Sequence, residues 1–289
     1  MRPTRRGRRV AALLVALAVT GAGLAWALDV PTADIVVAER CLATVNGTTH
    51  DLAPDQAANA ATITAIAVRR GLPARAATIA IATAIQESKL RNIDYGDLDS
   101  LGLFQQRPSQ GWGTPEQVMD PVYATNAFYD ALEKIDGYAD LEITEASDRV
   151  QRSAFPEAVA DHEPEGRAYA SALTGYSPAA LTCRLRPAEG AGDAGRVVEL
   201  LTRDLGDVGA VVSAEDPALA TVPTAGDDSG RRRAWAVAHW AVAQAAELDV
   251  VRVQADGRVW TRDEGADGWA PAPDDAPAGQ VVIEVASDS

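Results

Sequence analysis

The N-terminus places the strongest constraint on this chain. Five arginines precede residue 10, and an uncharged, largely apolar stretch then runs from Val10 to Leu28 before Asp29 ends it. A membrane-spanning helix needs roughly 20 such residues, and its basic flank stays in the cytoplasm. We therefore expect residues 1–9 to be a cytoplasmic tail, residues 10–28 to cross the cell membrane once, and the rest to lie outside.

A cleaved signal peptide is the alternative interpretation of this N-terminus. Ala25-Trp26-Ala27 has the small-x-small pattern of a cleavage site, and cleavage would release a secreted protein. The bulky Trp26 and Leu28 favour a retained anchor. Both interpretations place the remainder of the chain in the same extracytoplasmic compartment.

The two cysteines, Cys41 and Cys183, agree with export. In an oxidising compartment such a pair is expected to form a disulfide, and two buried free thiols are the alternative. None of the three histidines has ligand spacing with a cysteine, so we expect no metal site.

The chain is strongly acidic, with a formal net charge of -15. Nucleic-acid partners are excluded, because phosphate binding needs clustered lysine and arginine. A long-range field would not attract an anionic wall polymer either. Any glycan binding should therefore depend on a local groove.

Residues 41–185 are expected to form a helical domain in a mainly α protein. Periodic apolar positions, rich in alanine, alternate with glycine and proline stops, and no convincing strand precedes Cys183. The expected helices run over about residues 55–71, 73–90, 121–135, 144–152 and 156–173.

A glycine-rich linker over residues 186–196 leads to a smaller α+β unit over residues 197–289. We expect helices over about residues 197–205 and 232–248, and strands over 250–253, 258–261 and 281–285. Asp256-Gly257 is a strong hairpin signal. Four tryptophans of this unit form either its core, which we favour, or a ligand surface: Trp235, Trp240, Trp260 and Trp269. His239 between them is expected to be structural.

Glu87 is the first candidate for chemistry. It follows Ala80, Thr83 and Ala84 on one face of an otherwise apolar helix, near the end of that helix. Poor solvation should raise the pKa of the carboxyl, as a general acid requires near neutral pH. An ordinary surface glutamate is the alternative.

A second motif lies downstream of Glu87-Ser88, at Gly102-Leu103-Phe104-Gln105. The pair resembles the signature of the soluble lytic transglycosylases, which have Glu-Ser at a helix end and Gly-Leu-Met-Gln about fifteen residues later. Phe104 stands where that family has methionine. The segment is also similar to uncharacterised actinobacterial membrane proteins related to that fold, and the resemblance covers about residues 58–175.

The resemblance implies a lysozyme-like fold and cleavage of the β-1,4 bond between N-acetylmuramic acid and N-acetylglucosamine in peptidoglycan, without a cofactor. Glu87 would be the catalytic acid/base, Ser88 would orient the substrate, and Gln105, with Gln106 beside it, would line the groove. The family's third motif, Ala-Tyr-Asn-Ala-Gly, has no clear counterpart. The nearest segment, residues 167–172, lacks its asparagine and glycine.

Three aspartates in the intervening loop are candidates for a second acid: Asp94, Asp97 and Asp99. A second carboxylate would position water and give hydrolysis. The resemblance to lytic transglycosylases implies instead a reaction that uses a single acidic group. The alternative is that these aspartates cap turns. A calcium loop is disfavoured, because Gln105 stands where the twelfth position requires glutamate.

Aromatic residues are candidates for a sugar platform. Trp112 between two glycines suits a stacking face, and Tyr95 and Phe104 are further candidates, with local packing as the alternative. Arg107 would meet a peptide-stem carboxylate or pair with a nearby aspartate. A glycan-binding or wall-assembly module without turnover is the alternative to an enzyme.

Overall fold

The computed structural model describes residues 38–151, 156–273 and 279–287, and from Glu39 onward these residues group as one compact unit. The expected cytoplasmic tail and membrane anchor, residues 1–28, lie outside the described residues. Within the described part, no helix is both long and apolar enough to cross a membrane.

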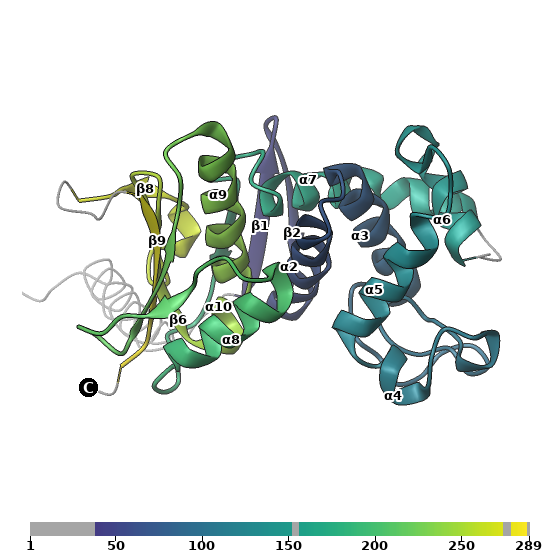
Figure 1. Ribbon diagram of the computed structural model, residues 1–289, viewed down its shortest axis with the longest axis horizontal. Helices are drawn as coiled ribbons and strands as arrows, with labels where there is room; N and C mark the ends of the chain where they lie inside the picture. The colour runs from purple at the N-terminus through teal and green to yellow at the C-terminus, as the bar shows by residue number, and fades with distance from the viewer. Residues whose placement is uncertain (1–37, 152–155, 274–278, 288–289) are drawn as a thin grey trace, which may run out of the picture. The chain divides into compact units, whose positions relative to one another are not determined.

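The helices expected over about residues 55–71, 73–90, 121–135 and 144–152 are confirmed to within a few residues, whereas the segment 156–173 is 3-10 up to His162 and α-helical only from Glu163. Helix α3 (Ala74–Ser88) packs against α2 (Pro54–Arg69), α5 (Pro121–Leu132), α6 (Ile143–Gln151) and α7 (Glu163–Leu173) (Figure 1). Small side chains allow this close packing: α7 crosses α3 at Gly166, where a Cβ would lie 2.9 Å from the carbonyl oxygen of Thr78. The remaining elements of this region are α4 (Pro115–Val118) and short 3-10 turns at Pro108–Gln110, Tyr138–Asp140 and Pro156–His162.

The expectation of no strand before Cys183 is wrong. Strands β1 (Arg40–Val45) and β2 (Thr48–Leu52) form a hairpin, and β3 (Leu181–Arg184) pairs with the other edge of β1. The hairpin turns at Asn46-Gly47, whose φ angles of 51° and 78° suit a tight left-handed turn. The third strand arrives from far along the chain, so local sequence patterns do not reveal this sheet.

The disulfide between Cys41 and Cys183 is confirmed. The two cysteines stand directly opposite each other on β1 and β3, so the bond closes the helical region onto its own start. In the chain-entropy model, a disulfide that closes a loop of 142 residues stabilises the folded state by about 5 kcal/mol.

The C-terminal region is an α+β arrangement, as expected, but it holds more strands than predicted. Its antiparallel sheet has six strands in the order β4-β5-β9-β6-β7-β8. The strands are β4 (Val211–Val212), β5 (Leu219–Pro223), β6 (Val250–Ala255), β7 (Arg258–Thr261), β8 (Ala270–Pro271) and β9 (Gln280–Val285), and the helices are α8 (Ala194–Leu205), α9 (Asp228–Ala243) and α10 (Ala245–Leu248). With two antiparallel sheets, the fold is mixed α/β rather than mainly α.

Helix α9 lies between the six-stranded sheet and the helical region, packing on β6 and β9 as well as on α2, α7 and β3 (Figure 1). The tryptophans of this region are core residues: Trp235, Trp240 and Trp260 are at most 2% exposed. Buried His239 bonds through Nδ1 to the carbonyl oxygen of Ala172 at 2.7 Å. The interpretation of this aromatic cluster as core is confirmed.

Candidate active site

Glu87 lies in the last turn of α3, where Lys89 and Leu90 stop the helix in left-handed conformations. The side chain is half-buried, and burial raises the pKa of its carboxyl. Among the described residues, no side chain bonds to this carboxylate. A carboxyl with a raised pKa and no internal partner is available to a ligand.

Ser88 ties the end of α3 to the second motif. Its hydroxyl bonds to the carbonyl oxygens of Ala84, at 3.1 Å, and Leu103, at 2.7 Å, and the residue is only 8% exposed. The expected contact with substrate is therefore replaced by an internal one. Ser88 positions the neighbouring Glu87 relative to the second motif.

Gly102 begins the second motif in a conformation that only glycine fits. Its φ is 78°, and a Cβ would lie 2.3 Å from the carbonyl oxygen of Val118. Gln105 follows in a left-handed conformation, and its amide nitrogen lies 3.3 Å from the carbonyl oxygens of Tyr95 and Gly102. The Gln105 side chain therefore folds back onto its own loop, although it remains partly exposed.

Two expected substrate contacts, Phe104 and Gln106, are core residues instead. The Phe104 ring is fully buried and stacks on Phe128 with 4.7 Å between ring centroids. Gln106 is 1% exposed and donates to the carbonyl oxygen of Ala124 at 3.1 Å. The tight turn at Gly102 sends these side chains inward, so neither can meet a ligand at the surface.

Asp99 braces the loop between the motifs. It accepts bonds from Nε of Arg107 at 2.8 Å and from the backbone and hydroxyl of Ser109 at 2.8 and 2.9 Å. These bonds hold the pKa of the Asp99 carboxyl far below its usual range. Asp94 and Asp97 are exposed nearby. Across the described residues, no three His, Cys, Asp or Glu side chains gather to hold a metal ion.

A groove of about 630 Å³ opens beside the second motif. It is lined by Gln110, Trp112, Ala131, Lys134, Ile135, Arg149, Val150 and Gln151. Trp112 is only partly buried, which leaves part of it available for stacking. Tyr95, 69% exposed on the preceding loop, is a second accessible aromatic ring. Glycan contact by both rings stays a prediction.

The end of α3 and one groove residue, Gln151, contact consecutive carbonyl groups of the second motif. The hydroxyls of Thr83 on α3 and Ser147 on α6 lie 2.9 Å apart, one turn before Glu87 and Gln151 respectively. One turn further on, Gln151 donates to the carbonyl oxygen of Phe104 at 2.5 Å, and Ser88 bonds to that of Leu103. The C-terminal ends of α3 and α6 thus both reach the second motif, so the groove residue Gln151 lies near the end of the helix that carries Glu87.

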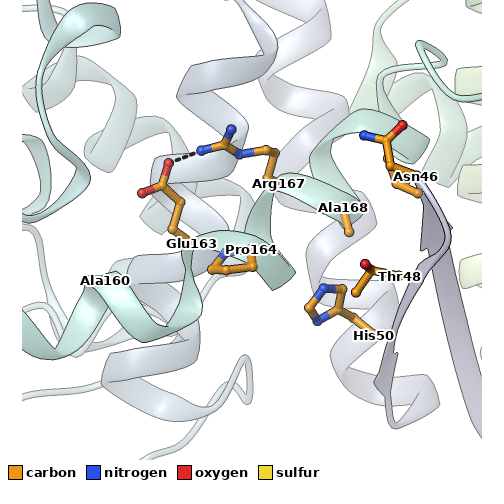
Figure 2. Close-up of a pocket in the computed structure, with 9 residues that line it drawn as sticks. Asn46, Thr48, His50, Ala160, Glu163, Pro164, Arg167 and Ala168 are labelled. Carbon is orange, nitrogen blue, oxygen red and sulfur yellow. Dashed lines mark hydrogen bonds and ion pairs between the residues drawn. The ribbon is translucent and has the colours of Figure 1, made fainter.

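A second cavity, of about 410 Å³, lies between the β1–β2 hairpin and α7 (Figure 2). Asn46, Thr48 and His50 line its hairpin side. On the other side, Glu163 pairs with Arg167, as Figure 2 shows, and with Arg75 at 2.5 Å. Because its carboxylate is held between two arginines, this cavity is a weaker candidate for acid–base chemistry.

The four polar groove residues are not expected from sequence: Gln110, Lys134, Arg149 and Gln151. They come from three separate segments and carry no shared short-range motif, and Trp112 was the one local signal of this groove. No protein-family model matches the chain, and no curated protein is significantly similar to it in sequence.

Proposed function

We propose that this protein cleaves the β-1,4 bond between N-acetylmuramic acid and N-acetylglucosamine in peptidoglycan, with Glu87 as catalytic acid and base. The observation that carries the proposal is the Glu87 carboxyl, half-buried, unpaired among the described residues and raised in pKa by burial. The end of its helix and Gln151 of a groove of about 630 Å³, which Trp112 also lines, both bond to the second motif.

In the proposed reaction, protonated Glu87 donates its proton to the glycosidic oxygen as the bond from C1 to that oxygen breaks. The N-acetyl group of the substrate assists at C1. The ionised Glu87 then takes the proton of the muramic-acid C6 hydroxyl, whose oxygen bonds to C1. The product is a 1,6-anhydro sugar, Glu87 is protonated again, and neither water nor a cofactor is consumed.

The state of Asp99 favours this one-carboxylate reaction over hydrolysis. Asp99, which would be a candidate to activate water, accepts bonds from Arg107 and Ser109 instead. A carboxylate engaged in this way is a poor base, because those bonds stabilise its ionised form.

We further propose that the reaction takes place outside the cytoplasm, with the protein anchored by residues 10–28. The disulfide between Cys41 and Cys183 supports an oxidising compartment. Protease treatment of intact cells tests this placement: the folded part should be degraded without lysis, whereas protection would contradict it.

The test of the proposed activity is the Glu87→Gln substitution in the full-length protein. With purified peptidoglycan as substrate, we expect turnover to fall by about 10²–10⁴-fold, because the general acid is lost while its shape is kept. Released muropeptides are identified by mass. Unchanged turnover would remove Glu87 from the mechanism.

Glu165→Gln is the matched control. Glu165 on α7 is also half-buried, and burial likewise raises the pKa of its carboxyl. Within the described part of the chain, no hydrogen bond or ion pair joins it to the second motif, so we expect its substitution to leave turnover intact. Equal losses in both variants would indicate a general effect on the fold.

A glycan-binding module without turnover is the second candidate function. It is favoured by Tyr169, which stands in the segment nearest to the family's third motif. The ring is fully buried, and its hydroxyl donates to the carbonyl oxygen of Cys41 at 2.7 Å, so this segment offers the groove no tyrosine. Glycan binding by folded protein with no product after prolonged incubation would favour this function.

A further inference from the structure

The groove beside Glu87 differs in charge from the chain as a whole. The protein has a net charge of -15, yet Lys134 and Arg149 line the groove, and no aspartate or glutamate is among its described lining residues. Such local concentration of positive charge within an acidic protein favours an anionic group of a ligand.

Both cations are accessible to a ligand. Lys134 follows the end of α5 with an exposed side chain and has no ion-pair partner among the described residues. Arg149 pairs with Glu145 one turn earlier on α6, at 2.5 Å, and both side chains are about half exposed. Exposed pairs of this kind contribute little, so a ligand carboxylate can compete for Arg149.

The other walls of the groove suit a sugar chain that carries such a group. Trp112 supplies a stacking face, and the amides of Gln110 and Gln151 supply donors and acceptors. Of the two expectations for Arg107, a ligand carboxylate or a nearby aspartate, the structure bears out the second, because Arg107 pairs with Asp99. Of the two cations of the groove, Lys134 has no ion-pair partner among the described residues, and Arg149 has only the exposed pair with Glu145.

We propose that Lys134 and Arg149 bind a carboxylate of the substrate, so that the site selects acidic glycan strands over neutral ones. This inference rests on the proposed function, because it names the strands that the Glu87 site accepts. The carboxylate has two possible sources in peptidoglycan, the lactyl group of muramic acid and the stem peptide, and both present the same chemistry to the groove.

The test measures dissociation constants of three glycans for the full-length Glu87→Gln protein, which binds without turnover. The ligands are peptide-free peptidoglycan strands, peptide-bearing strands and a neutral chitin oligomer of similar length. We expect acidic strands to bind more tightly than chitin, and higher salt to reduce the difference. Preference for peptide-free strands over chitin would identify the lactyl carboxylate, and preference for peptide-bearing strands alone the stem peptide.

Substitutions locate the selectivity. Lys134→Gln and Arg149→Gln should each weaken binding of acidic strands by about tenfold. The dissociation constant for acidic strands should thereby approach that for chitin. Arg233→Gln, at an exposed arginine of α9, makes the same charge change away from the groove and should leave the preference intact. Melting temperatures confirm that the variants are folded.

Two results would overturn the inference. One is equal affinity for acidic and neutral strands, and the other is an equal loss of preference in Arg233→Gln, which would trace selectivity to net charge. The proposed function fails separately: charge-selective binding by a protein with Glu87 intact that releases no product would retain the groove assignment and reject the catalytic one.

Discussion

Two carboxylates in this molecule, Asp204 and Glu87, are removed from water in different ways. Asp204 on α8 is fully buried and accepts bonds from Thr62 of α2 at 3.1 Å and Trp240 of α9 at 3.0 Å, while its neighbour Arg203 donates at 2.7 Å. Glu87 is partly removed from water and has no such donor among the described residues. The first carboxylate joins three helices, whereas the second is left for a ligand.

The backbone conformation near the two carboxylates also differs. Asp204 lies in the last turn of α8, at the junction with α2 and α9, and the residue with positive φ that ends this helix is a glycine, Gly206. Around Glu87, four non-glycine residues have left-handed φ angles between 48° and 57°: Lys89, Leu90, Leu98 and Gln105. Sparsely populated backbone conformations cost free energy and cluster at functional sites. Comparison of the two regions therefore contrasts a structural carboxylate with the one that we propose to be functional.

Replacing Asp204 should have the largest effect on stability. Asp204→Ala leaves Thr62 and Trp240 without their shared acceptor, and we expect the free energy of unfolding to fall by about 3 kcal/mol. Urea denaturation measures this loss. Asp136→Ala, at an exposed aspartate, is the control and should stay within about 0.5 kcal/mol of the parent. Equal values for the two variants would remove the structural role of Asp204.

Gly102→Ala should have an intermediate effect. The added methyl group meets the carbonyl oxygen of Val118 in a left-handed conformation, so we expect a loss of about 2 kcal/mol together with reduced turnover. Gly111→Ala has a similar φ of 86° but open space around its Cβ, and should cost about 1 kcal/mol. Thermal unfolding distinguishes the two, and equal losses would show that the contact with Val118 is unimportant.

Glu87→Gln should have the smallest effect on stability, and of opposite sign. Because the folded-state pKa of Glu87 lies above its ordinary value of 4.5, the stability it contributes is present below that pH and lost as pH rises through the folded-state pKa. At pH 7 the neutral glutamine should therefore stabilise the protein by roughly 1 kcal/mol. The gain should vanish below pH 4.5. A loss of stability at pH 7 would mean that Glu87 has a structural partner.

Much of the helical region could be predicted from sequence, because its helices have apolar periodicity and clear stops at residues such as Gly71 and Pro73. The three-stranded sheet could not be, since β3 joins β1 from far along the chain. The Asn46-Gly47 pair was the available local signal of a hairpin. In the C-terminal region, β5 ends at Pro223 in a segment whose composition resembles a loop.

The candidate site could be predicted only in part. Glu87 stands out because an apolar helix ends on a carboxylate, and that property is local. Motif spacing does not determine which side chains face inward, so Phe104 and Gln106 were wrongly assigned to the groove. The cations Lys134 and Arg149 meet only through the packing of α5 and α6, which no short pattern encodes.

The most direct test of the central claim is the fate of solvent oxygen during cleavage. The full-length protein would digest peptidoglycan in water enriched in oxygen-18, and the released muropeptides would be analysed by mass. If Glu87 is the one acting carboxylate, the wild-type protein should release 1,6-anhydro products without the heavy isotope. The Glu87→Gln variant should release no such products. Heavy oxygen at the new sugar end would contradict the account, because it would require a second group that activates water.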